Sequence, residues 1–171
     1  MSYALKQIRL LLLDVDGVMT DGGIIYDGNG LETKVFNVKD GHGIKMLQRA
    51  GIQVGIITGR TSAVVDIRAR ELGIDLLYQG ALRKLESYED IKCRTGLNDH
   101  QIAYMGDDVI DVPVMRRVGF SAAPVDALPE ALAAAGYVST RAGGKGAVRE
   151  VCDLILKGVG AWDEVTARYE L

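Results

Sequence analysis

Residues 8–22 read IRLLLLDVDGVMTDG, and this stretch decides the fold. The run at 8–13 is largely apolar and ends in acids, which is typical of a central parallel strand with both faces buried. If the extended path continues, the side chains of Asp14 and Asp16 point the same way, with Val15 opposite. The sequence therefore predicts two convergent carboxylates at the carboxyl end of a buried strand.

Beyond this strand, strand patterns and helix patterns alternate. Residues 22–37 alternate around the turn signal Asp27-Gly28-Asn29-Gly30, which predicts a β-hairpin. A helix is predicted over 41–50, because Gly51 is a typical helix stop. Further strands are predicted at 52–57, 76–78, 102–105 and 120–122, and helices at 62–72, 82–95, 109–118, 128–135 and, as the last helix, 145–156. This order predicts an α/β fold with a doubly wound parallel sheet, in one domain over residues 1–171. Ligands in such sheets bind beyond the carboxyl ends of the strands.

The composition is that of an ordinary globular protein. Of 171 residues, 48% are hydrophobic and 25% are charged, and the net charge is -3. The chain therefore has no overall basic field for nucleic acid or anionic lipid. No export signal or membrane span is expected, and Cys93 and Cys152 are too isolated to indicate a disulfide framework. We therefore expect a cytoplasmic protein with no nucleic-acid or membrane partner.

A second group of acids follows a later predicted strand. Asp107, Asp108 and Asp111 come after its end, so they can meet Asp14 and Asp16 across one crevice. Clustered carboxylates repel one another, and a hard cation such as Mg²⁺ removes this conflict. The sequence therefore predicts a metal site with Mg2+ as the cofactor.

The same acids indicate phosphoryl transfer. Asp14 is the candidate nucleophile, since a carboxylate can attack phosphorus, and Asp16 is the candidate general acid and base. Thr58, after the strand predicted at 52–57, and Lys84, at the start of a helix, can contact the transferring phosphoryl group. Taken singly, each of these residues has a structural explanation as a turn former, a helix cap or a solvated charge.

Only the ordered set of motifs overcomes these structural explanations. The chain resembles the haloacid dehalogenase superfamily in four motifs, Asp14-Val15-Asp16-Gly17-Val18-Met19-Thr20, Thr58, Lys84, and Gly106-Asp107-Asp108 with Asp111. The resemblance implies that Asp14 is the nucleophile, that Asp16 is the acid and base, and that Asp14, Asp107 and the backbone carbonyl of Asp16 hold the metal. Asp108 and Asp111 would be supporting acids. Phosphatases and mutases of the superfamily carry Asp at the position of Asp16, whereas the transport ATPases carry Thr.

The chain has no room for a cap domain between Asp16 and Thr58, so another element must exclude water from the site. A partner subunit is the simplest source. The predicted hairpin is apolar enough that pairing with other hairpins would bury an aggregation-prone edge, through residues Ile24, Ile25, Tyr26, Val35 and Phe36.

Three further segments, at 37–41, 58–60 and 143–150, resemble the capless family of 3-deoxy-D-manno-octulosonate 8-phosphate phosphatases. The resemblance implies hydrolysis of that small acidic sugar phosphate in the synthesis of lipopolysaccharide precursors. It also implies a homotetramer whose hairpins meet at the centre and whose C-terminal segment closes over a neighbouring active site. Arginine suits bidentate carboxylate recognition, and the implied substrate contacts are Asp16, Asn37, Val38, Lys39, Asp40, Gly41, Arg60, Arg68 and Lys84.

Other functions remain open at this point. Phosphatases of nine-carbon sialic-type acid 9-phosphates are similar in the four motifs, but the basic residues Arg60 and Lys145 favour the octulosonate. A phosphomutase would need a cap to hold its bisphosphate intermediate away from water. A non-catalytic regulatory partner with the same fold could lose acids that this chain retains. A receiver domain carries its phosphorylated Asp on a later strand.

Overall fold

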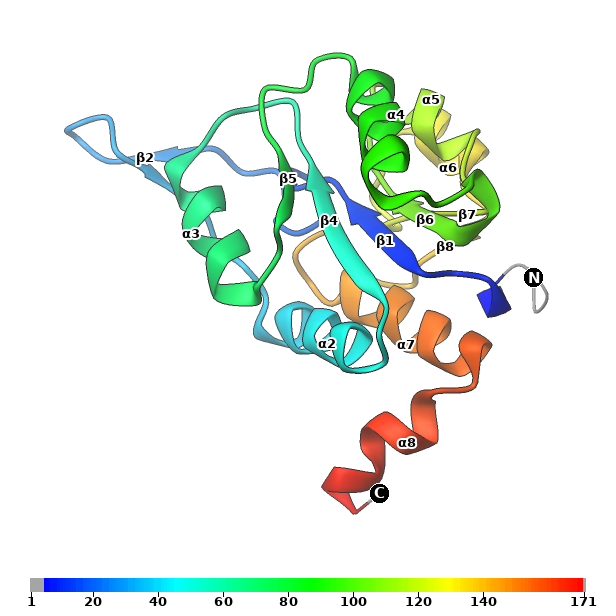
Figure 1. Cartoon of the computed structure of the whole chain (residues 1–171). Coiled ribbons are helices and arrows are strands. Elements are labelled where there is room, and N and C mark those ends of the chain that lie inside the picture. The colour runs from blue at the N-terminus through cyan, green and yellow to red at the C-terminus, as the bar shows by residue number, and fades with distance from the viewer. Residues whose placement is uncertain (1–4, 171) are drawn as a thin grey trace.

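A sheet of six parallel strands forms the centre of the protein (Figure 1). The computed structural model describes residues 5–170, and the strand order among them is β5-β4-β1-β6-β7-β8. The strands are β1 (Leu10–Leu13), β4 (Gln53–Ile57), β5 (Leu76–Tyr78), β6 (Ile102–Met105), β7 (Phe120–Ala123) and β8 (Tyr137–Val138). The predicted doubly wound parallel sheet is confirmed.

Strand β1 is buried on both of its faces. Leu11 and Leu13 join the hydrophobic cluster on one face of the sheet, and Leu10 and Leu12 join the cluster on the other. All four side chains are fully buried, which explains a continuous apolar run in place of an alternating one. The strand ends beside β6, where the Asp14 N–H donates to the carbonyl of Met105 at 3.0 Å.

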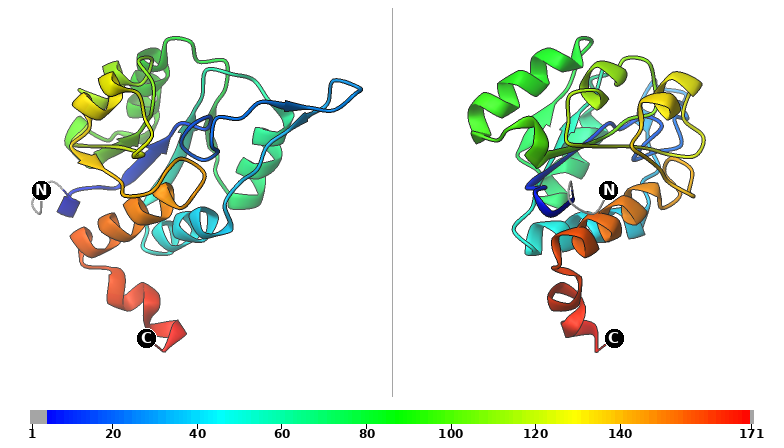
Figure 2. Two further views of the ribbon diagram at one scale, coloured as in Figure 1. Left: turned by 180° about the vertical axis from the view of Figure 1, so that it is seen from behind. Right: turned by 90° about the vertical axis from the view of Figure 1, so that its right-hand side faces the viewer.

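Helices cover both faces of the sheet (Figures 1 and 2). One layer packs against the cluster of Leu11 and Leu13 and consists of α2 (Val38–Arg49), α3 (Ala63–Leu72) and α7 (Ala147–Val159). The opposite layer consists of α4 (Lys84–Thr95), α5 (Val112–Met115) and α6 (Pro129–Ala134). A short 3-10 helix, η1 (Asp99–Gln101), leads into β6.

The direction of the strand order reverses at β1. From β1 the chain builds β4 and β5 on one side, and it then returns to build β6, β7 and β8 on the other. Because the connections diverge on either side of β1, an open crevice is expected at the carboxyl ends of β1, β4 and β6. A binding site is therefore expected at this edge.

Strands β2 (Ile25–Tyr26) and β3 (Glu32–Thr33) form the predicted hairpin, which projects away from the sheet (Figure 2). The Asp27 carboxylate accepts the N–H groups of Asn29 and Leu31 at 2.8 Å each, and these bonds stabilise the turn. Residues 14–52, all of which the structure describes, form only this hairpin and α2 between β1 and β4. No cap domain is therefore inserted there, as the sequence predicts.

Some element boundaries differ from the sequence prediction. Helix α2 begins at Val38 instead of 41, because the Asn37 side chain accepts the Lys39 N–H and caps the helix. Helix α5 covers only Val112–Met115 of the predicted 109–118. Residues 109–111 form a turn instead, in which the Asp111 N–H donates to the carbonyl of Asp108 at 3.0 Å.

The prediction that the helix at 145–156 is the last one was wrong. Helix α7 is followed by α8 (Trp162–Thr166) and by the 3-10 helix η2 (Ala167–Tyr169). Such short helices contain too few residues for a periodic pattern to stand out. The segment lies beyond α7, away from the sheet (Figure 1), and the Tyr169 hydroxyl contacts His42 Nε2 at 2.9 Å and Arg49 Nη1 at 2.7 Å. None of the helices formed by residues 5–170 is both long and apolar enough to cross a membrane.

Candidate active site

A small pocket lies where β1, β4 and β6 end, and it brings together residues from all three strand ends. Its volume is about 160 Å³, and its lining residues are Asp14, Asp16, Thr58, Gly59, Arg60, Asp107, Asp108 and Ile110. Asp14 follows β1, Thr58 follows β4 and Asp107 follows β6. The crevice expected from the strand order is therefore present and carries the predicted acids.

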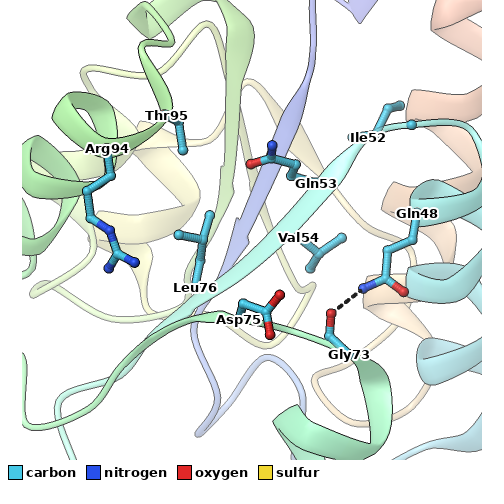
Figure 3. Close-up of a pocket in the computed structure, with 10 residues that line it drawn as sticks. Gln48, Ile52, Gln53, Val54, Gly73, Asp75, Leu76, Arg94 and Thr95 are labelled. Atoms are coloured by element: carbon cyan, nitrogen blue, oxygen red, sulfur yellow. Dashed lines mark hydrogen bonds between the residues drawn. The ribbon is translucent and has the colours of Figure 1, made fainter.

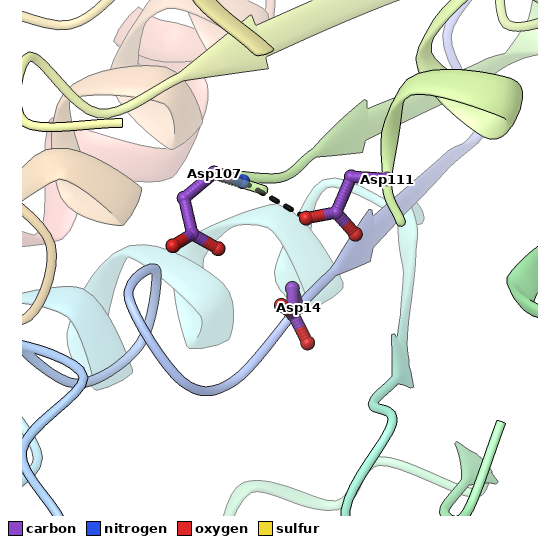
Figure 4. Close-up of side chains that lie close together, drawn as sticks. All are labelled: Asp14, Asp107 and Asp111. Carbon is purple, nitrogen blue, oxygen red and sulfur yellow. Dashed lines mark hydrogen bonds between the residues drawn. The ribbon is translucent and has the colours of Figure 1, made fainter. Parts of the chain in front are cut away.

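Three carboxylates converge beside this pocket (Figure 4). Asp14, Asp107 and Asp111 each offer a carboxylate oxygen that lies within 4.8 Å of the others. Asp111 is fully buried, and its Oδ2 accepts the N–H groups of Asp107 and Asp108 at 3.0 Å each. Its Oδ1 accepts bonds from Lys84 Nζ and the Tyr104 hydroxyl. Asp111 therefore orients the loop after β6, while Asp14 and Asp107 face the pocket.

Lys84 is the cation of this cluster. Its side chain is fully buried, and Nζ lies 2.8 Å from Asp14 Oδ1 and 2.6 Å from Asp111 Oδ1. Three ionised carboxylates and one ammonium group leave two uncompensated negative charges in a buried site. Such an excess is costly unless a cation shares the site.

Asp107 has the features of a metal ligand. Its Oδ1 is buried and has no hydrogen-bond partner among residues 5–170. Its carboxylate also lies directly against Gly17, since a Cβ at that position would stand 2.0 Å from Asp107 Oδ2. The charge excess, the free carboxylate oxygen and the all-oxygen donors fit a hard divalent cation.

The pKa values of the two acids reflect the same charge excess. Burial raises the pKa of Asp14 to about 6, with Lys84 opposing the rise and Asp111 adding to it. Burial, followed by the charges of Asp14 and Asp111, raises the pKa of Asp107 to about 8. In the absence of a cation, Asp107 therefore resists ionisation at neutral pH.

Asp16 belongs to a separate group of charges that the hairpin completes. Lys34 Nζ contacts Asp16 Oδ1 and lies 3.5 Å from Glu32 Oε1. Arg60 Nη2 lies 2.8 Å from the same Glu32 oxygen, and Nη1 lies 4.0 Å from Asp16 Oδ2. Two carboxyl groups, of Asp16 and Glu32, therefore meet two cationic side chains here. The sequence gives no signal for Lys34 and Glu32, because charged residues in a short hairpin are usually solvated.

The structure does not bring the other predicted substrate residues into this pocket. Asn37 caps α2, and Asp40 is buried, with Oδ1 accepting the N–H of Arg149 in the first turn of α7 at 2.8 Å. The Val38 side chain is exposed, and Lys39 lines a different, basic pocket. The Arg68 guanidinium packs against Gly41, where a Cβ would stand 2.3 Å from Nη2. Arg68 and residues 37–41 form a second group, which lies outside the pocket that holds Asp14 and Asp107.

The loop before α7 packs against the loop after β1. A Cβ at Gly143 would stand 1.9 Å from the carbonyl oxygen of Gly17, and the Gly144 N–H donates to Val18 at 3.0 Å. Helix α7 itself is part of the core. In this structure Gly143 and Gly144 therefore support the loop that carries the chain's own acidic site.

A larger pocket of about 690 Å³ lies at the opposite ends of the strands (Figure 3). It is lined by the starts of β4 and β5, at Gln53 and Leu76, and by the ends of α2, α3 and α4. Its charged lining residues are Asp75 and Arg94, and Arg94 donates to the Tyr78 hydroxyl at 2.8 Å. The converging acids are absent from its lining, so size alone does not identify the active site.

Comparisons with known proteins agree with this geometry. No protein-family model matches the chain. The chain is 50% identical over 159 residues to the 3-deoxy-D-manno-octulosonate 8-phosphate phosphatase of Escherichia coli strain K12, and the match covers 93% of this chain and 85% of that relative.

Solved structures show the same similarity. The phosphatase of that name from Moraxella catarrhalis, in complex with a magnesium ion, a phosphate ion and a KDO molecule, is 42% identical with a TM-score of 0.96, over 98% of this chain and 97% of that one. The cobalt-bound Haemophilus influenzae enzyme is 42% identical with a TM-score of 0.90, over 93% of each chain. A Legionella pneumophila hydrolase of the haloacid dehalogenase superfamily has a TM-score of 0.95 at 44% identity, over 98% of this chain and 92% of that one. The chain therefore belongs to the family of 3-deoxy-D-manno-octulosonate 8-phosphate phosphatases, which are phosphomonoesterases of the haloacid dehalogenase superfamily.

Proposed function

We propose that the chain hydrolyses 3-deoxy-D-manno-octulosonate 8-phosphate to the free sugar acid and phosphate, through an aspartyl-phosphate on Asp14, in the synthesis of lipopolysaccharide precursors. The observation that carries the proposal is the pocket at the sheet edge, where Asp14 and Asp107 converge beside Thr58 and Asp16. Membership of the family supports this substrate, and the position of Asp14 in the pocket, with an acid two residues away, supports its role as nucleophile.

The proposal includes Mg²⁺ held by Asp14, Asp107 and the backbone carbonyl of Asp16. The excess of carboxyl groups over cations around Lys84 supports a divalent cation, as does Asp107 Oδ1, which has no hydrogen-bond partner among residues 5–170. When bound, the ion supplies positive charge that offsets the phosphoryl oxygens and lowers the repulsion between them and a carboxylate nucleophile. Asp108 and Asp111 act as supporting acids, and Asp111 does so through the loop N–H groups.

In the first step a carboxylate oxygen of Asp14 attacks phosphorus, and the bond between phosphorus and the sugar oxygen breaks. The electron pair of that bond goes to the sugar oxygen, which takes a proton from Asp16. Thr58 and Lys84 stabilise the charge on the transferring group and on Asp14, since Lys84 Nζ lies 2.8 Å from Asp14 Oδ1. The products of this step are the free sugar acid and phospho-Asp14.

In the second step water attacks the phosphorus of phospho-Asp14. Asp16, now ionised, takes a proton from the water. The bond between phosphorus and the Asp14 oxygen breaks, its electrons return to the carboxylate, and inorganic phosphate leaves. Each group is then in its starting state.

Recognition of the sugar acid is assigned to cationic and polar residues. Arg60 lines the pocket beside Asp16 and suits the substrate carboxylate or hydroxyl groups. The second group, with Arg68 and residues 37–41, lies apart from that pocket in the same chain. We propose that it contacts substrate held at a neighbouring subunit's acids, which requires an oligomer.

The proposed oligomer is a homotetramer built on the hairpins. Ile24, Ile25, Tyr26 and Val35 are exposed on this projecting element, and burial of such apolar side chains favours association. A C-terminal segment that reaches a neighbouring active site belongs to the same proposal. One domain over residues 1–171 and a cytoplasmic location stay predictions.

Phosphate release tests the proposed function. Purified protein is assayed with octulosonate 8-phosphate, nine-carbon sugar acid 9-phosphates and hexose phosphates, each with Mg²⁺ and with EDTA. We expect Mg²⁺-dependent turnover with a preference for the octulosonate. A preference for the nine-carbon substrates would overturn the substrate assignment, and no turnover of any phosphate monoester would favour a regulatory partner.

The Asp14→Asn variant tests the nucleophile. The amide keeps nearly the same shape but cannot form an acyl phosphate, so we expect turnover to fall by about 10⁴-fold or more while the protein stays folded. Asp90→Asn is the matched control, because Asp90 lies on α4, outside the pocket, where its carboxylate accepts a bond from the Tyr78 hydroxyl. Near-normal activity of Asp14→Asn would remove Asp14 from the mechanism.

A further inference from the structure

The hairpin places a buried lysine on the carboxylate proposed as general acid and base. The Lys34 side chain is only 1% exposed, and its Nζ contacts Asp16 Oδ1 and lies 3.5 Å from Glu32 Oε1. Lys34 does not line the pocket that holds Asp14 and Asp16. Its contact with Asp16 is therefore made outside the lining of that pocket.

From these contacts we propose that Lys34 is a positioning residue, which fixes the direction of the Asp16 carboxylate toward the leaving group. The inference rests on the proposed function, in which Asp16 protonates the leaving oxygen. Glu32 holds the Lys34 ammonium in place, and Arg60 binds Glu32 from the other side at 2.8 Å.

The burial of Lys34 favours this role over a purely structural one. A buried ion pair gains little net stability, because removing the charges from water costs about as much as their attraction returns. An apolar side chain of the same length could fill the same space. A lysine in this position instead fixes a carboxylate whose direction matters, as in other preorganised acid–base pairs.

The loop around Asp16 shows why its side chain needs such a contact. Asp16 lies between the end of β1 and Gly17, whose positive φ of 88° marks a sharp change of direction. Lys84 contacts the Asp14 carboxylate, whereas the contacts of the Asp16 carboxylate with charged groups come from Lys34 and Arg60. The hairpin therefore takes part in the acid–base geometry of its own subunit.

The experiment measures how kcat/KM depends on the leaving group. A series of substituted phenyl phosphates, from nitrophenyl to phenyl, is assayed together with octulosonate 8-phosphate. Nitrophenolate is a good leaving group and departs without a proton, whereas unsubstituted phenolate and a sugar alkoxide need a proton from the acid. The parameter kcat/KM covers steps only as far as leaving-group departure, so hydrolysis of phospho-Asp14 does not enter it.

We expect Lys34→Met to steepen the dependence of kcat/KM on leaving-group pKa. The loss should be within about 3-fold for nitrophenyl phosphate and about 10²-fold or more for the sugar phosphate, the scale of general acid catalysis. Asp16→Asn should show the same steepening, and the double variant should lose little more, since the two residues act as one unit. Lys34→Arg, which keeps the charge in a different shape, should restore part of the activity.

Equal losses across all leaving groups, or additive losses in the double variant, would overturn the role. If Lys34→Met does not fold, Lys34→Gln, which also removes the charge, is measured in its place, and an unchanged slope in that variant decides against the role in the same way. Lys92→Met is the matched control, because Lys92 also pairs with two acids, Glu89 and Asp99, but lies on α4. If instead the proposed function is wrong and Asp14 is not the nucleophile, Asp14→Asn retains its activity on nitrophenyl phosphate, whatever the Lys34 variants show.

Discussion

Gly17 is the residue that allows Asp107 to lie beside the loop after β1. A Cβ there would stand 2.0 Å from Asp107 Oδ2, and the backbone φ is +88°. Gly17→Ala should therefore push the Asp107 carboxylate away from Asp14. We expect Mg²⁺ affinity to fall by about 10-fold or more, the scale seen when the groups around a metal ligand are disturbed. Calorimetric Mg²⁺ titration measures this change.

A control for Gly17→Ala has to separate the clash from backbone strain. Gly51 also has a positive φ, of 75°, but a Cβ at Gly51 would meet no atom of the described chain within 4 Å. Gly51→Ala should cost about 1 kcal/mol of unfolding free energy and leave Mg²⁺ affinity unchanged. Equal Mg²⁺ affinities in the two variants would show that Asp107 does not depend on the space at Gly17.

At the residue scale, the sequence predicts the convergence of the acids, but it does not predict that Lys34 contacts one of them. Asp14 and Asp107 follow strands whose ends share one sheet edge, so their proximity follows from the strand pattern. Lys34 reaches Asp16 from the position directly after β3, a hairpin strand of two residues. No local periodicity indicates that this lysine turns inward, because the partner carboxylate is 18 residues away.

At the scale of elements, α7 begins without a side-chain cap of its own. Its N-cap position is Gly146, and the Asp40 carboxylate from α2 accepts the Arg149 N–H in its place. Asp40→Ala should therefore destabilise the protein by about 1–2 kcal/mol, the usual effect of losing a cap. Urea unfolding measures this change.

Asp40→Asn is the informative partner variant. Burial raises the pKa of Asp40, so folding disfavours its ionised form, and wild type loses stability as pH rises through that raised pKa. The amide keeps an acceptor oxygen and carries no charge. We expect Asp40→Asn to be as stable as wild type or more stable at pH 8, and a loss equal to that of Asp40→Ala would show that the charge itself is required.

The elements that the sequence missed are those without a long pattern. Strand β8 has two residues and α8 has five, and their positions depend on contacts with distant parts of the chain. Tyr169 bonds His42 and Arg49 across more than 100 residues. The long helices and buried strands could be predicted, because their periodicity is local.

At the scale of the whole molecule, the acidic cluster links stability to pH and to metal. The pKa of Asp14 is raised to about 6 and that of Asp107 to about 8, from 3.8 in the unfolded chain. A raised carboxyl pKa means that the folded protein binds more protons than the unfolded one. The associated stability is present at low pH and is lost as pH rises through these values. Metal-free protein should therefore become less stable between pH 5 and pH 8.

Mg²⁺ should reverse this loss, because a cation favours the ionised carboxylates. We expect the melting temperature in EDTA to fall by about 4–8 °C relative to that in Mg²⁺ as pH rises from 5 to 8, which corresponds to about 2 kcal/mol. When the melting temperature in EDTA is subtracted from that in Mg²⁺ at each pH, the contribution of groups outside the site, such as His42, cancels. Asp107→Asn should make the curves parallel, whereas Asp90→Asn should leave them divergent. Parallel curves for wild type would mean that the carboxylates of Asp14 and Asp107 are not the groups that bind the metal.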